Sequence, residues 1–198
     1  MALKIKYNSP VILTFALISI AVFFINYIIW GDLKTGTPGL MQEYFVLSGT
    51  WNWGDPFNYF RLFSYSLGHA DLGHIAGNMS LFLLIAPIME EKYGSQNIAK
   101  MMIITILVTA VFQIILFDTG LVGASGLVFM FVVLVSFANV EKGTIPLTFI
   151  LVAIFYVGQE VLRSMDNDNT SQYAHIVGGI MGGVFGFMFE DSTDIEKK

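Results

Sequence analysis

Six apolar runs, separated by polar stretches, dominate the hydrophobic pattern of the chain. A helix needs about 20 apolar residues to cross a bilayer, and each run has close to that length. The runs lie at residues 11–30, 72–89, 98–117, 123–140, 146–162 and 173–189. The first is too long for the core of a cleaved signal peptide, and no small-residue cleavage site follows it. The pattern therefore predicts an all-α membrane protein, residues 1–198 forming one domain with six transmembrane helices.

The stretches between the runs differ in length. Residues 31–70 form a long stretch rich in glycine and aromatic side chains, which suits the level of the lipid headgroups. A loop of this length usually has a function or some structure of its own. The other stretches are short polar breaks, at residues 90–97, 118–122, 141–145 and 163–172. We therefore expect one substantial loop, between the first two spans.

The basic residues predict the orientation in the membrane. Loops that face the cytoplasm carry an excess of Lys and Arg. A cytoplasmic N-terminus puts seven basic residues inside, namely Lys4, Lys6, Lys92, Lys100, Lys142, Lys197 and Lys198. Three then lie outside, namely Lys34, Arg61 and Arg163. We therefore expect a multi-pass protein of the cell membrane with both termini cytoplasmic and the long first loop outside.

The composition narrows the possible partners. The chain is 55% hydrophobic and 13% charged, whereas a soluble domain carries roughly 25% charged residues. Its net charge of -5 argues against nucleic acid, because no basic patch is present to neutralise phosphates. The absence of cysteine removes disulfides, thiolate zinc sites and a cysteine nucleophile. The lipid bilayer is therefore the expected surrounding.

Polar side chains within the predicted spans are the candidates for chemistry, because they are costly to bury in a membrane. The informative ones among them are His74, Asn78, Gln113, Ser125, Glu160 and His175. With the predicted topology, Ser125 and the two histidines lie toward the outer side at a similar depth. Three unrelated polar residues would have no reason to share one depth, so we expect them to form one site.

Ser125 lies in the string Gly123-Ala124-Ser125-Gly126, at the expected start of the fourth span. The first N–H groups of a helix have no partner within the helix, and such groups can stabilise an oxyanion beside the serine Oγ. The same string is also compatible with a helix cap followed by a packing glycine. The string alone therefore does not decide between a nucleophile and a structural turn.

His175 begins a face of small residues on the sixth span. The face consists of Gly178, Gly179, Gly182, Gly183 and Gly186. Such faces let two helix backbones approach closely. If the neighbouring helix is the fourth span, His175 can reach Ser125 and act as its base. The alternative is a dimerisation face with an incidental histidine.

His74 and Asn78 are four residues apart, and thus lie on one helix face. The asparagine NH₂ group is a donor of the kind that stabilises an oxyanion. A metal site built from His69, His74 and His175 is the alternative, with Asp71 as the nearby carboxylate. The chain lacks an H-E-x-x-H motif, so we expect neither a metal nor any other cofactor.

Taken together, these residues resemble the rhomboid intramembrane serine proteases, in particular the six-span bacterial branch. The resemblance runs from Arg61 to Gly186 and depends on the order of several short motifs. They are Arg61 and His69, His74-x-x-x-Asn78, Glu90 with Gly94-Ser95, Gly123-x-Ser125-Gly126, and Ala174-His175-x-x-Gly178-x-x-x-Gly182.

The resemblance implies a serine endopeptidase that cleaves transmembrane helices of membrane-protein substrates in a bacterial inner membrane. It implies Ser125 as nucleophile and His175 as base, with the oxyanion held by the Ser125 N–H, His74 and Asn78. Glu90 resembles the family's structural carboxylate, and Gln113 stands where some members relay water. We expect His69, His74, Asn78, Gln113 and Ser125 to line a cavity that holds this water. The loop at 163–172 resembles the cap over the site, and span five the lateral gate.

Three positions depart from the family pattern. Phe129 stands where a tyrosine commonly stacks on the catalytic histidine, and it can stack without a hydroxyl. Phe60 stands where a tryptophan often precedes the arginine, and Asn58 stands near an upstream glutamate position.

Two rival interpretations remain. An inactive rhomboid-like protein that binds membrane helices would have lost Ser125 or His175. A small transporter would carry a polar path across both leaflets.

Overall fold

The computed structural model of the chain describes residues 4–31, 39–138, 144–152, 154–155 and 172–190. In this part of the chain nearly all regular structure is helical. The long helices are α1 (Pro10–Trp30), α4 (Leu72–Tyr93), α5 (Ser95–Leu116), α6 (Ser125–Leu134) and α8 (Gln172–Glu190). The short elements are α2 (Leu40–Tyr44), β1 (Leu47–Ser48), α3 (Pro56–Ser64), β2 (Gly120–Leu121) and the 3₁₀ turn η2 (Val135–Phe137). Residues 147–152 and 154–155 are also helical.

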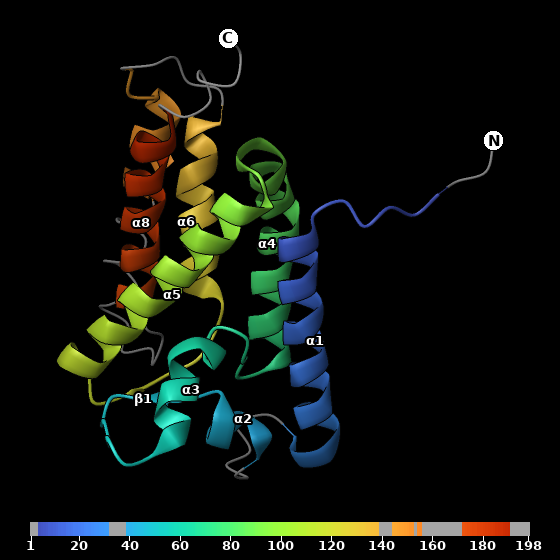
Figure 1. Cartoon of the computed structure of the whole chain (residues 1–198), viewed down its shortest axis with the longest axis vertical. Helices are drawn as coiled ribbons and strands as arrows, with labels where there is room; N and C mark the ends of the chain where they lie inside the picture. Colours follow the sequence, from blue (N-terminus) through green and yellow to red (C-terminus); the bar gives the residue numbers. More distant parts are fainter. Residues whose placement is uncertain (1–3, 32–38, 139–143, 153, 156–171, 191–198) are drawn as a thin grey trace.

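The helices form a bundle in which α6 and α8 lie side by side, α1 flanks α4, and α5 runs obliquely across them (Figure 1). The start of α1 meets the end of α4, because Val11 lies at hydrogen-bond distance from Glu90. The end of α4 meets the end of α8 through the rings of Tyr93 and Phe189. The start of α1 and the end of α8 therefore lie at the same end of the bundle.

Among the described residues, three helices are long and apolar enough to cross a membrane, namely α1, α4 and α5. The helix of the fourth predicted span runs from Ser125 to Phe137 in two parts, α6 and η2, and is shorter than these three. Helix α8 covers the sixth predicted span. The fifth predicted span, 146–162, is described only to residue 155, and its Glu160 lies outside the described residues, as does nearly all of the loop at 163–172.

The polar stretch at residues 90–97 is itself largely helical. Helix α4 continues to Tyr93 and α5 begins at Ser95, so that Gly94 alone separates them. Polar residues are adequate helix formers at an aqueous boundary, and composition alone therefore does not end a helix there. The chain reverses at Gly94, whose φ of 79° suits glycine.

The first loop has structure of its own. Helices α2 and α3 and strand β1 gather at the end of the bundle opposite the end of α8 (Figure 1). Strand β1 pairs antiparallel with β2, Leu47 opposite Leu121 and Ser48 opposite Gly120. Because β2 lies four residues before Ser125, the first loop is hydrogen-bonded to the segment that leads into α6.

Candidate active site

A cavity of about 820 Å³ brings together five of the predicted site residues, His74, Asn78, Ser125, Phe129 and His175. Its lining comes from α4, α6, α8 and the helical residues at 147–152 and 154–155, including Val152 and Phe155. The polar residues come from the first two turns of their helices. This arrangement places a hydroxyl, two imidazoles and an amide around one space.

Ser125 is the first residue of α6, and Ala124 before it has non-helical dihedral angles. The turn is positioned by Gly123, whose N–H donates to the Tyr65 carbonyl at 2.9 Å. Gly123 has a φ of 130°, a conformation that residues with a side chain rarely adopt. Its backbone therefore takes a path that delivers Ser125 to the helix start with its side chain on the cavity.

Two donors face this glycine. A methyl group placed on Gly123 would lie 2.8 Å from His74 Nε2 and 3.8 Å from Asn78 Nδ2. The Ala70 N–H donates to His74 Nδ1 at 3.4 Å, so that the neutral ring carries its proton on Nε2. Asn78 Nδ2 is buried and makes no hydrogen bond within the described part of the chain. Buried donors are normally paired, so an unpaired amide beside a cavity is suited to an incoming acceptor.

The α4 helix is fixed at its start by Asp71, whose Oδ1 accepts from the His74 N–H at 2.9 Å. This side-chain cap sets where the helix begins, and hence which face carries His74 and Asn78. Both residues then point from one α4 face toward the turn before Ser125. The cap therefore contributes to the alignment of the donors.

His175 lies on α8, close against α6. A Cβ on Gly178 would lie 2.0 Å from the Gly126 carbonyl oxygen, and one on Gly182 would lie 2.3 Å from that of Met130. Side chains at these positions would push the two helices apart. The glycine face predicted for the sixth span thus lies against the helix that carries Ser125. The Phe129 ring lies 4.6 Å from the His175 ring, tilted by 37°.

His69 and Gln113 were expected to line this cavity, but neither belongs to its lining. The His69 ring is packed against His74 at 5.1 Å, and burial lowers the pKa of His69 to about 3, with His74 adding to the effect. The Gln113 side chain is fully buried between Tyr173 and the Thr119 carbonyl. Both expectations rested on sequence order, which does not say which way a buried side chain turns.

Glu90, near the end of α4, connects this helix to the starts of α1 and α5. The Glu90 carboxylate accepts from the N–H groups of Val11 at 3.1 Å and Ile12 at 3.0 Å, and from the Ser95 hydroxyl at 2.6 Å. It therefore caps the start of α1 and interacts favourably with the positive end of the α1 helix dipole.

Arg61 ties the first loop together. Its guanidinium donates to the Glu43 carbonyl at 2.8 Å, to Asp55 at 3.0 Å and to Asn58 at 2.8 Å. Asp55 also caps α3 through the Phe57 N–H, and this bond and Arg61 lower the pKa of Asp55. Asp55 was not singled out in the sequence, although an aspartate before a proline is a common helix start.

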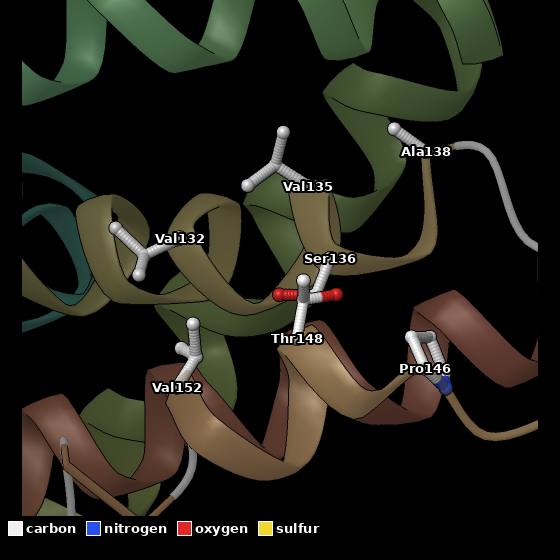
Figure 2. A pocket seen from close by; sticks show the side chains of 7 residues that line it. All are labelled: Val132, Val135, Ser136, Ala138, Pro146, Thr148 and Val152. Atoms are coloured by element: carbon white, nitrogen blue, oxygen red, sulfur yellow. The ribbon is translucent and has the colours of Figure 1, made fainter.

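A second cavity of about 510 Å³ adjoins the first and shares Val132 and Val152 with it. It lies between α6 with η2 and the helical residues at 147–152, and its polar side chains are Ser136 and Thr148 (Figure 2). Val132 is seven residues along α6 from Ser125, or about 10 Å. The second cavity therefore lies next to the first and farther along α6 from the serine.

The comparison with protein families bears directly on this arrangement. The family model described as a rhomboid domain matches residues 56–192 of the chain. The chain belongs to the rhomboid family. The comparison with curated proteins finds no match. The matched range contains the whole cavity lining and all the residues through which the chain resembles rhomboids. With its apolar spanning helices, this rhomboid-family chain is a membrane protein.

Proposed function

We propose that this protein is an intramembrane serine endopeptidase that uses Ser125 as nucleophile and His175 as general base. The observation that carries the proposal is the cavity that Ser125, His175, His74 and Asn78 line together. Membership of the rhomboid family supports the same activity. No cofactor enters the proposed reaction.

In the proposed reaction the Ser125 Oγ attacks the carbonyl carbon of the scissile peptide while His175 takes the hydroxyl proton. The oxyanion is stabilised by the Ser125 N–H, His74 Nε2–H and Asn78 Nδ2. His175 then gives its proton to the leaving amine, and an acyl-enzyme remains. Water, deprotonated by His175, attacks the ester, and the serine recovers its proton as the carboxyl product leaves.

The proposed substrates are transmembrane helices of other membrane proteins, cut near small residues where a helix unwinds easily. Gly77 and Leu81 of α4 line the cavity together with Val152 and Phe155, and the side chains of Leu81 and Phe155 are exposed. A substrate helix entering there would reach Ser125 from the lipid. The neighbouring cavity, which is lined mainly by apolar side chains, suits the apolar segment next to the cleavage site.

We further propose a catalytic dyad. Among the described residues, the cavity lining contains no Asp or Glu, and a loop carboxylate would have to be desolvated to reach it. The tilted Phe129 ring can orient His175 by stacking. The test of the dyad substitutes five carboxylates by their amides, namely Asp71, Asp118, Glu160, Asp166 and Asp168. The last three lie outside the described residues. A folded variant as inactive as Ser125→Ala would replace the dyad by a triad.

The proposed topology has six spans with both termini in the cytoplasm. The start of α1 and the end of α8 lie at the same end of the bundle (Figure 1). This arrangement supports an even number of membrane crossings. The excess of Lys and Arg on one side supports the orientation. Reporter fusions at the C-terminus test it, and a reporter found outside the cell membrane would refute it.

The direct test of the activity is incubation of the purified protein, in liposomes, with a single-span helix containing a small-residue, helix-breaking site. We expect cleavage that is lost in Ser125→Ala and in His175→Ala. Binding of the helix without any cleavage by the wild type would instead identify an inactive rhomboid-like binding protein.

A further inference from the structure

Tyr173 lies two residues before His175, in the first turn of α8, and binds the end of α5. Its hydroxyl donates to Gln113 Oε1, and its ring stacks on Phe117 with 4.1 Å between centroids and 19° between planes. Gln113 lies in the last turn of α5, and Phe117 is the residue that ends this helix. The first turn of α8 is thus attached to the point where the chain leaves α5.

The same network continues to the turn that carries the proposed nucleophile. Gln113 Nε2 donates to the Thr119 carbonyl, which also accepts from the Gly49 N–H at 3.1 Å. Thr119 precedes strand β2, and four residues later the Gly123 N–H is bound by Tyr65. The turn at 117–124 is therefore held at both ends, and Gln113 connects it to Tyr173. Both polar atoms of the Gln113 side chain are used by protein groups.

The close contact between α6 and α8 does not by itself fix how the two helices are rotated and shifted relative to each other. Glycine faces bring two helix backbones together, as Gly178 and Gly126 show. However, a smooth glycine surface has few side-chain ridges to lock into grooves, and such ridges are what fixes the relative rotation and translation of packed helices. A directional hydrogen bond at the start of α8 supplies the missing constraint, next to His175.

We propose that Tyr173 is a positioning residue, which holds the first turn of α8 on the turn at 117–124 and thereby sets His175 relative to Ser125. Gln113 is the tether in this arrangement, with no part in relaying water. The inference rests on the proposed function, since it concerns the alignment of the same two side chains. It adds a residue that the motifs of the family resemblance do not contain.

The test measures the reactivity of Ser125 with a serine-directed fluorophosphonate, which does not require a membrane substrate to be bound. The variants are Tyr173→Phe, which keeps the ring on Phe117, Gln113→Leu, and the double variant. Tyr59→Phe is the control, because it removes a tyrosine hydroxyl that donates to the Trp53 carbonyl on the exposed first loop. Active-site titration gives the reactive fraction, and the time course gives the rate constant per reactive site.

We expect the rate constant of Tyr173→Phe to fall about tenfold, because small misplacements of reacting groups are costly, with the reactive fraction unchanged. Gln113→Leu should show a similar loss, and the double variant should be no slower than the slower single variant, because all three lack the same bond. Tyr59→Phe should react like the wild type.

Several results would overturn the inference. A rate constant in Tyr173→Phe equal to that of the wild type would exclude positioning, as would a loss confined to the reactive fraction, which a merely structural residue would cause. Single losses that multiply in the double variant would show that the two residues act separately. A wild-type protein that neither reacts at Ser125 nor cleaves a helix would refute the proposed function itself, and the inference with it.

Discussion

Substitution of Gly178 by alanine tests whether the close approach of α6 and α8 is needed for activity. The new methyl group would lie 2.0 Å from the Gly126 carbonyl oxygen, whereas ordinary contact begins at 3.4 Å. The oxygen belongs to the backbone next to Ser125 and cannot turn away. The helices must therefore separate locally by about 1.4 Å, the difference between these two distances.

The consequence for the proposed reaction follows from the position of His175, which is three residues before Gly178 and hence about one helical turn away. A displacement of α8 moves His175 away from α6 by a similar distance. A misplacement of about 1 Å can cost on the order of 10² in rate. Overpacking of this kind also costs about 1–3 kcal/mol of stability. We therefore expect at least a hundredfold loss of cleavage in molecules that remain folded.

The matched control is Gly183→Ala on the same helix, where the new methyl would lie 3.6 Å from the Phe149 ring, in ordinary contact. Alanine favours helix over glycine by up to about 1 kcal/mol, so this variant should be as stable as the wild type or slightly more so. Initial rates on a single-span substrate are measured well below the melting temperature of each variant. Wild-type rates in folded Gly178→Ala, or equal losses in both variants, would refute the role of the α6–α8 contact.

Three further substitutions test other parts of the site and its scaffold. Gly123→Ala should lower initial cleavage rates by at least about 10², because the methyl would lie 2.7 Å from His74 Cε1 at a φ of 130°; a folded variant with wild-type rates would contradict this. Asn78→Ala removes a buried donor and should cost on the order of 10² in rate with little change in the melting temperature. Unchanged rates in both Asn78→Ala and His74→Ala would remove these residues from the site. Glu90→Gln weakens the cap on α1 and should lower stability by about 1–2 kcal/mol at an unchanged rate per folded molecule; an unaltered thermal melt would count against the cap.

The starts of two long helices could be predicted from the sequence. Apolar runs of membrane-spanning length are a local property, and the starts expected at Leu72 and near Ser125 agree with the helices α4 and α6. The glycine face on the sixth span was also visible, because it depends only on helical periodicity. Membership of the rhomboid family was predicted from the spacing of the motifs and is confirmed by the family comparison.

The tertiary structure decided which distant residues form hydrogen bonds with one another. Glu90 caps a helix start 78 and 79 residues away, and nothing near Glu90 in the sequence names Val11 or Ile12. Gln113 could equally have faced the cavity, and only the placement of Tyr173 and Thr119 turns it away. Hydrophobic periodicity selects the buried face of a helix, because burial of apolar surface is nondirectional. Hydrogen bonds between distant residues are directional and need both partners in place, so they depend on how the helices pack.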